Sequence, residues 1–195
     1  FVSADAWDIP ANYKRIKYNI CRVGFDPQTG HTVGRVDTIF NARGMGKSAN
    51  HPRPSYNGRF LLFTMSDYGC FPIWHKEADQ WLLDLRTMKA RPLDKINSPN
   101  TDSYHNWSRN SHWIVFTSRR INGYYTQLYL AHVDDNGRMG KPFLLPQRDP
   151  GPYYDRLLYS YNTPDFTLRP VKLDARKTAN RIMNKSRAQT QIMHN

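Results

Sequence analysis

The sequence has few features of a disulfide-stapled, metal-binding or membrane-spanning protein. Its 195 residues include only two cysteines, Cys21 and Cys70, with no CxxC spacing, so they are expected to be free thiols. The absence of CxxCH excludes a covalently attached haem, and no cofactor or metal is expected. The longest apolar runs, such as Arg59–Phe63, cover a handful of residues, whereas a membrane-spanning helix needs about 20. The sequence therefore predicts no transmembrane segment.

What the composition does contain favours a loop-rich β protein. Hydrophobic residues make up 39% of the chain, which is on the low side, while 13 prolines and 11 glycines indicate many turns. Twelve tyrosines and five tryptophans favour strands over helices. The length suits one domain or a part of a larger one.

The net charge of +12 is distributed unevenly along the chain. Residues 1–47, 48–98 and 99–150 are each only mildly basic, while residues 151–195 hold eight Lys or Arg against three Asp. This region is interpreted either as a solvated, partly helical tail or as a docking arm for an acidic partner, anionic lipid or nucleic acid. No known nucleic-acid-binding motif is present, so no nucleic-acid partner is expected.

One stretch of the sequence occurs twice, 53 residues apart. Pro54–Asp67 reads PSYNGRFLLFTMSD, and Trp107–Arg120 reads WSRNSHWIVFTSRR. In each copy a turn signal precedes a short run of β-branched and aromatic residues, which predicts a strand. The copies share four aligned residues: Ser55 with Ser108, Asn57 with Asn110, Phe63 with Phe116, and Thr64 with Thr117.

Further strand candidates surround each copy of this repeat. A short strand is expected before each turn, around Arg53–Tyr56 and His105–Ser108, and a pair of strands after it, within Gln80–Leu93 and Gln127–Leu145. Four antiparallel strands that recur about every 50 residues indicate the blades of a β-propeller. Alternation along the strands places Phe60, Leu62, Trp113 and Val115 in the core between blades.

The beginning of the chain aligns with the second half of such a blade. Tyr18–Phe40 matches the last two strands, with a hairpin turn at Asp26–Gly30, and Phe1–Ser3 matches the end of the second strand. A chain that begins inside a blade is expected to be a fragment of a longer protein, or to be completed by another copy. Tyr153–Pro170 is expected to form either a closing strand or a strap across the last blade.

The predicted fold is all-β: a partial β-propeller of about two and a half four-stranded antiparallel blades, with an irregular or partly helical basic C-terminal tail. The expected boundaries are residues 1–150 for the propeller, with blades at 1–47, 48–98 and 99–150, and residues 151–195 for the strap and tail.

The repeated stretches resemble the strand-turn-strand motif of the TolB-like, or WD40-like PD40, propellers. Tyr56-Asn57 and Arg109-Asn110 replace the usual Pro-Asp of the turn, and both pairs still suit a tight turn. Asp102–Gln147 resembles C-terminal blades of Bacteroidetes-type periplasmic or outer-membrane-associated proteins. The resemblance implies a location in the cell envelope, periplasmic or associated with the outer membrane, and a scaffold or docking role.

A polar and aromatic group of side chains is expected on one face of the propeller. Asp67–Trp81 joins the second and third strands of its blade, and in a propeller this loop emerges on the same face as the loop that leads into the next blade. The expected binding residues are Trp74, His75, Glu77, Asp79, Asp102, His105, Arg119, Arg120 and Tyr124. Three roles remain open for them: hydrogen-bonded bracing between blades, contact with a ligand or partner, and catalysis.

The function expected from these features is that of a non-catalytic envelope scaffold, which binds a protein or glycan partner on its loop face. The remaining blades would come from the same longer chain or another copy. The alternative is a polysaccharide lyase or hydrolase of propeller type that uses His75, Glu77 and His105. Whether the chain is an enzyme is left open, and the spacing matches no metal-binding motif.

Overall fold

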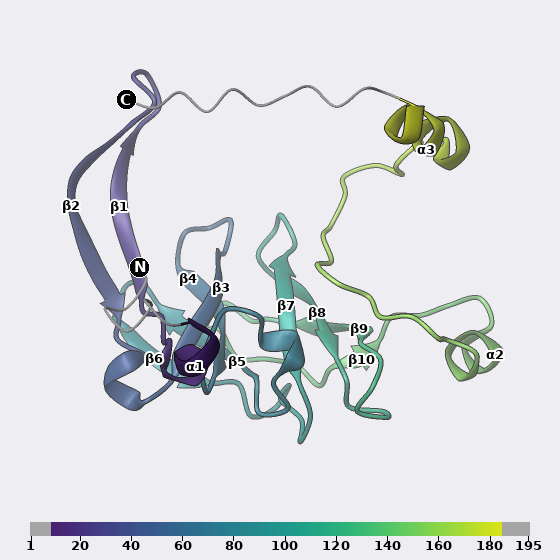
Figure 1. Ribbon diagram of the computed structural model, residues 1–195, viewed down its shortest axis with the longest axis horizontal. Helices are drawn as coiled ribbons and strands as arrows, with labels where there is room; N and C mark the ends of the chain where they lie inside the picture. Colours follow the sequence, from purple (N-terminus) through teal and green to yellow (C-terminus); the bar gives the residue numbers. More distant parts are fainter. Residues whose placement is uncertain (1–8, 185–195) are drawn as a thin grey trace.

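Two four-stranded antiparallel sheets form the centre of the computed structural model, which describes residues 9–184 (Figure 1). The first sheet consists of β3 (Ser48–Pro54), β4 (Phe60–Ser66), β5 (Asp79–Asp84) and β6 (Lys89–Pro92). The second consists of β7 (Asp102–Trp107), β8 (Trp113–Ser118), β9 (Gln127–His132) and β10 (Phe143–Leu144). In both sheets the strands are neighbours in chain order, as in a propeller blade.

A two-stranded sheet lies beside the first blade. It consists of β1 (Ile20–Asp26) and β2 (His31–Phe40), and this long hairpin extends well beyond the strands of the blades (Figure 1). The two blades and the half-blade confirm the predicted partial propeller. The predicted strand at Phe1–Ser3 lies outside the described residues.

Short helices connect or flank the strands. The structure contains α1 (Ile9–Asn12), η2 (Tyr13–Arg15), η3 (Arg43–Met45), η4 (Pro72–Trp74), α2 (Pro150–Asp155) and α3 (Ala175–Asn184). No helix among residues 9–184 is long and apolar enough to cross a membrane.

The sequence repeat encodes a repeated turn. The Ser55 hydroxyl donates a hydrogen bond to Asn57 Oδ1 at 2.7 Å and accepts one from the Phe60 backbone N–H at 2.9 Å. Ser108, Asn110 and Trp113 form the same two bonds, at 2.7 and 3.0 Å. Each turn therefore sets the register between the first two strands of its blade. The Asn57 N–H also donates to Ser111 Oγ at 3.0 Å, which joins the turns of the two blades.

The inner strands β3 and β7 begin earlier than the sequence predicts. Both contain a bulge at an equivalent position, where His51 (φ 52°) and Tyr104 (φ 39°) adopt left-handed backbone conformations. A bulge interrupts the alternation of side chains, so the period of two cannot be followed through these strands. The rings of His51 and Tyr104 meet edge to face, with centroids 4.6 Å apart.

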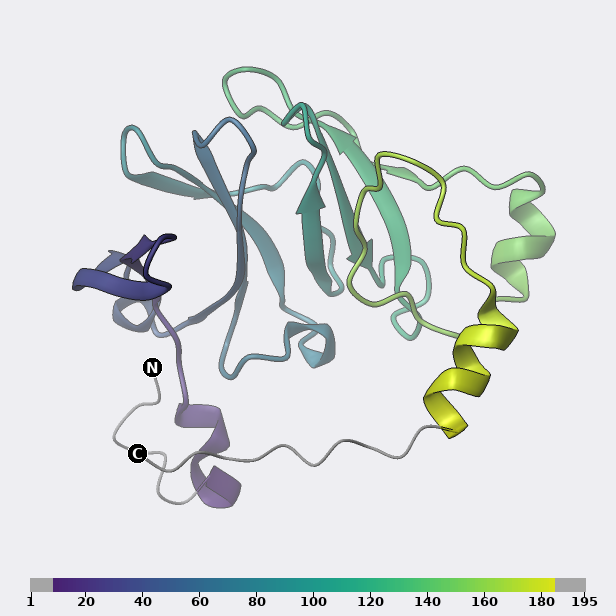
Figure 2. The ribbon, with the colours of Figure 1, turned by 90° about the horizontal axis from the view of Figure 1, so that it is seen from above.

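The hydrophobic core lies between blades and follows the alternation along the strands. Phe60 and Leu62 point from the first blade to the second and pack in one cluster with Ile114 and Phe116, which confirms the first two as core residues between blades. The opposite side of the first blade packs on the half-blade through a second cluster: Ile20, Ala42, Ala49, Leu61, Phe63, Met65 and Leu83. The blades therefore stack side by side, as viewed in Figure 2.

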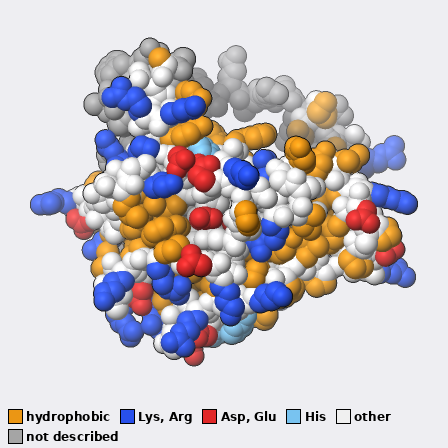
Figure 3. All heavy atoms as spheres, turned by 90° about the horizontal axis from the view of Figure 1, so that it is seen from below, with side chains coloured by type: hydrophobic (Ala, Val, Ile, Leu, Met, Phe, Trp, Pro, Cys, Tyr) orange, Lys and Arg blue, Asp and Glu red, His pale blue; other side chains and the backbone are white. Residues whose placement is uncertain are grey.

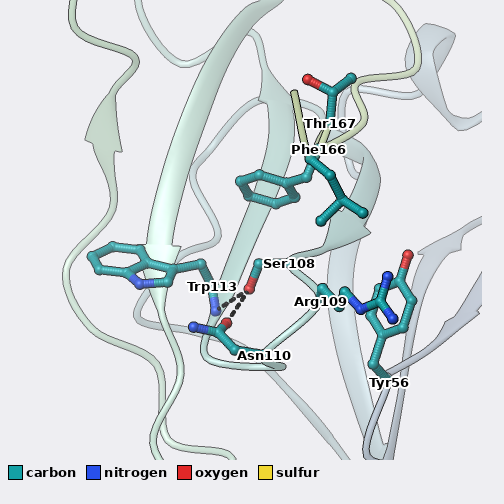
Figure 4. Close-up of a pocket in the computed structure, with 8 residues that line it drawn as sticks. Tyr56, Ser108, Arg109, Asn110, Trp113, Phe166 and Thr167 are labelled. Carbon is teal, nitrogen blue, oxygen red and sulfur yellow. Dashed lines mark hydrogen bonds between the residues drawn. The ribbon is translucent and has the colours of Figure 1, made fainter. Parts of the chain in front are cut away.

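The other side of the second blade is covered by a strap. Val115 on that side is buried and is paired with Asn106, whose side-chain amide donates to Pro164 O at 3.5 Å. Phe166 lies close to Trp113 and contributes to a pocket of about 390 Å³ between the strap and the β7–β8 turn (Figure 4). Residues 156–174 contain no strand, so the region forms a strap across the last blade and not a closing strand.

Candidate functional site

Three connections meet at one end of the two blades and form what we call the loop face. They are the β4–β5 loop (67–78), the β6–β7 connection (93–101) and the β8–β9 loop (119–126). The Thr101 hydroxyl donates to His75 O at 2.7 Å, and the Arg119 N–H donates to Thr101 O at 2.9 Å. The middle connection is thus hydrogen-bonded to both loops, and the loop face is a braced surface.

The β4–β5 loop holds an imidazole–carboxylate pair. His75 Nδ1 lies 2.9 Å from Glu77 Oε1, which also accepts a hydrogen bond from the Asp67 N–H at 3.2 Å. The edge-to-face ring of Tyr68, 4.3 Å from the imidazole between centroids, helps to bury His75. Because Glu77 is bonded on two sides, the pair is fixed in orientation.

Trp74 presents a large apolar surface beside this pair. Its side chain is 76% exposed, although η4 holds its backbone. The Arg119 guanidinium, from the neighbouring blade, lies 5.2 Å from the centre of the indole ring, in cation–π contact. Burial lowers the pKa of Arg119. The contact places an aromatic side chain and a cation from different blades on the same surface.

Asp102 and Arg120 form a buried ion pair beneath the loop face. Arg120 Nη2 lies 2.7 Å from Asp102 Oδ1 and also donates to Ile96 O at 2.6 Å. Asp102 Oδ2 accepts from the Ser98 N–H at 2.6 Å, and the guanidinium lies 4.4 Å from the centre of the Tyr129 ring. These contacts are all internal, so the pair braces the β6–β7 connection.

Asp79 is half-buried at the start of β5, and its carboxyl group has a raised pKa. Burial, followed by the nearby Asp102 carboxylate, raises the pKa of Asp79 to about 6. Lys47 opposes this shift without cancelling it. Asp79 therefore takes up a proton in mildly acidic solution, around pH 6.

Of the two remaining predicted residues, His105 lies apart from the loop face and Tyr124 lies on it. His105 lies in β7 within the sheet, with 1% of its surface exposed, and its Nε2 is 3.0 Å from Leu62 O. Burial lowers the pKa of His105 to about 3, so the ring is neutral. It does not join His75 and Glu77, because β7 runs away from the loop face after Asp102. Tyr124 is exposed in the β8–β9 loop, where its N–H donates to Asn122 Oδ1.

An apolar cleft of about 350 Å³ adjoins the pair, and sequence reasoning missed most of its walls. Its wall residues come from the β4–β5 loop and from the segment before β1: Tyr13, Ile16, Tyr18, Tyr68, Gly69, Cys70, Phe71, Trp74 and His75. Phe71 is 65% exposed, and the rings of Tyr13 and Tyr68 meet edge to face at 5.4 Å. The aromatic residues of the loop are visible in the sequence, but the contribution of Tyr13 is not.

Hydrogen bonds join the segment before β1 to the loop face. The Gly69 N–H donates to Ile16 O at 2.8 Å, and the Ser48 hydroxyl accepts from the Tyr18 N–H while donating to Gly69 O. The Lys17 ammonium donates to Asp67 O. The cleft is therefore assembled from parts of the chain about 50 residues apart.

The chemistry available at the loop face is that of a binding surface with one imidazole–carboxylate pair. Among residues 9–184, no cluster of three or more His, Cys, Asp or Glu side chains is placed to hold a metal ion. The face combines exposed aromatic rings, an apolar cleft and the Arg119 guanidinium beside Trp74. Such groups are enriched where proteins bind other proteins.

The strand order of the blades defines a partial β-propeller. Two solved structures have a similar arrangement of strands. The chain is similar to the crystal structure of TolB from Acinetobacter baumannii, with 19% identity and a TM-score of 0.39, covering 63% of this chain and 29% of that one. It is also similar to the β-propeller domain of the Trilobed protease from Pyrococcus furiosus, described as having an open velcro topology, with 15% identity and a TM-score of 0.40.

That second alignment covers 75% of this chain and 38% of the protease domain, so the chain spans less than two fifths of either solved structure. No protein-family model matches the chain, and no curated protein matches it. The assignment of the fold rests on the meander order and on the packing between the blades.

Proposed function

We propose that the chain is a non-catalytic binding module of the cell envelope that binds a protein partner at its loop face. The observation that carries the proposal is the apolar cleft beside the exposed side chains of Phe71 and Trp74. A cleft with mainly apolar walls suits the apolar side chain of a protein better than the hydroxyl groups of a glycan. The envelope location is supported by the resemblance of the repeats to the TolB-like motif.

Further blades complete the ring in this proposal, from the same longer chain or from another copy. The support is the half-blade, since within residues 9–184 β1 pairs only with β2 and most side chains of both strands are exposed. The same proposal divides the chain into blades at residues 1–47, 48–98 and 99–150 and a strap and tail at residues 151–195.

The test is retention of an envelope protein by the immobilised chain, followed by comparison of variants. Phe71→Ala/Trp74→Ala should lower the affinity for the retained protein about thirtyfold or more, because truncating a hot spot costs about 2 kcal/mol. Tyr56→Ala is the matched control, since Tyr56 is also exposed but lies in the β3–β4 turn, away from the loop face.

Both variants must melt at the same temperature as the wild type, so that a loss of affinity is not caused by unfolding. Equal retention by the double variant and the wild type would contradict a partner site at the cleft. Displacement of the bound protein by soluble glycans would move the proposal from a protein to a glycan ligand.

A second candidate function is a polysaccharide lyase or hydrolase at the same face. It is favoured by the fixed pair of His75 and Glu77, because an imidazole held by a carboxylate can act as a general base. The test is release of new reducing ends, or of unsaturated uronates absorbing in the ultraviolet, from neutral and acidic polysaccharides. Product that forms equally well with Glu77→Gln would exclude this pair as the catalytic group.

A further inference from the structure

The C-terminal arm, residues 168–184, exposes apolar side chains along its whole length. Leu168 is 77% exposed, Val171 and Leu173 are similarly exposed, and in α3 the values are 71% for Ile182 and 81% for Met183. Figures 1 and 2 show α3 at one side of the molecule, away from the strands of both blades. Ile182 and Met183 therefore pack on neither blade, whereas Leu168 lines the pocket beside Trp113.

The ten residues of α3 form a strongly amphipathic helix. At about 100° per residue, Ala175, Ala179, Ile182 and Met183 occupy one side of the helix. Lys177 and Arg181 occupy the other side, and Arg176 lies at the border beside Met183. No acidic residue lies within the helix. Arg176 and Thr178 thus border the apolar side, and the only charged residues of the helix are cations.

The rest of the arm continues this pattern. Including Arg169 and Lys172, the arm has five basic residues against one acidic residue, Asp174, for a net charge of +4 over 17 residues. The charge of the blades is more evenly mixed, and Figure 3 shows blue and red side chains interspersed over the face that it presents. The arm is therefore strongly basic for its length.

A helix of this length is not stable by itself in water. Isolated helices shorter than about 12 to 15 residues are marginal, and most helices in proteins are stabilised by packing of their apolar side. Since α3 packs on neither blade, its helical form and exposed apolar side point to a surface outside the described chain.

We propose that the C-terminal arm binds an anionic lipid surface, with α3 lying in the interface. Positive charges beside an exposed apolar side match the negative headgroups and the acyl layer of such a surface. A helix of ten residues is about 15 Å long, half of the hydrocarbon thickness, so it lies along the interface and does not cross it. This site is separate from the loop face and does not rest on the proposed function.

An acidic groove on another protein fits the arm less well. A helix that docks in a groove usually has large apolar anchors spaced over two or more turns. In α3 both large apolar residues, Ile182 and Met183, are in the last turn, and the others lie in the extended part of the arm. A fluid interface accommodates both parts without a shaped pocket.

The experiment is co-sedimentation of the full chain with large vesicles. One set contains phosphatidylcholine alone and another contains about 30 mol% phosphatidylglycerol, which gives the surface a negative potential. The chain should sediment with the anionic vesicles at about 0.15 M salt, and raising the salt to about 1 M should weaken binding because the charges are screened. Circular dichroism should show more helix when anionic vesicles are added.

Two sets of variants separate the contributions. Arg176→Gln/Lys177→Gln/Arg181→Gln should weaken binding about a hundredfold, since each cation near an anionic surface contributes about fivefold. Ile182→Ser/Met183→Ser should weaken it without changing the net charge. The matched control removes three exposed cations elsewhere, Arg86→Gln/Lys89→Gln/Lys141→Gln, and should bind within about twofold of the wild type.

Three results would overturn the proposal. They are equal binding to both kinds of vesicle, equal losses in the arm variant and the control variant, and no vesicle binding together with tight binding to an acidic polypeptide such as polyglutamate. The last result would assign the arm to an acidic protein partner.

Discussion

At the scale of single residues, Asp79 makes the stability of the fold depend on pH. Its raised pKa means that the folded state binds a proton more tightly than the unfolded chain, whose aspartate titrates near 3.8. Stability is thus highest below that value and is lost as the pH rises from about 4 to about 6. Above this window the folded protein holds an unfavourable carboxylate beside Asp102.

The prediction is that Asp79→Asn stabilises the protein at pH 7.5 and not at pH 4. The neutral amide removes the repulsion, and with allowance for solvent screening of a half-buried group the gain is on the order of 1 kcal/mol. Urea unfolding at both pH values measures it. The control is Asp37→Asn, in the exposed hairpin, and a gain for Asp79→Asn that is the same at both pH values would contradict the assignment.

His105 shows what the sequence could not predict about the site. A histidine near polar residues in a loop-rich sequence is compatible with a functional group at the surface. Its burial depends on the bulge at Tyr104 and on the packing of β7 against β4, which are long-range contacts with no local pattern. By contrast, His75 and Glu77 are two residues apart in one loop, and the structure does bring them together.

At the scale of elements, the repeated turn is the feature with the clearest local cause. In each copy a serine hydroxyl is hydrogen-bonded both to an asparagine side-chain oxygen and to a backbone N–H. The serine and the asparagine are residues that the two stretches of sequence share. The order of strands within a blade is predictable for the same reason. The position of the strap is not, because its contacts with Asn106 and Thr126 join distant parts of the chain.

We expect Ser55→Ala to destabilise the first blade by about 1 to 3 kcal/mol, because the buried Phe60 N–H loses its partner and Asn57 Oδ1 keeps only the bond from the Arg59 N–H. Ser108→Ala removes the same two bonds at a more exposed turn, where water can replace the hydroxyl, and should cost less than 1 kcal/mol, on the order of a surface hydrogen bond. Midpoints of urea unfolding give both values. Equal costs for the two variants would mean that the turns do not differ in solvent access.

At the scale of the whole molecule, the half-blade is, like the C-terminal arm, a part of the described chain whose packing is incomplete. Ile20 and Phe40 at its base pack on the first blade, whereas Val23, Phe25, Val33 and Val36 are exposed farther along the hairpin. A two-stranded sheet is marginally stable in water when neither face is covered. The hairpin therefore depends on what lies beside it in a way that β4 and β8 do not.

Hydrogen exchange measured by mass spectrometry can test this dependence. Amides of β1 and β2 beyond the base should exchange rapidly in a dilute, monomeric sample, while those of β4 and β8, which are paired on both sides, remain protected. If other blades from a second copy cover the hairpin, its protection should increase with protein concentration together with the mass measured by light scattering. If only a longer chain supplies them, protection should increase when that chain is used and should not depend on concentration. Slow exchange throughout the hairpin in a monomer of this chain would show that the half-blade is stable without further blades, and the case for completing the ring would lose its physical basis.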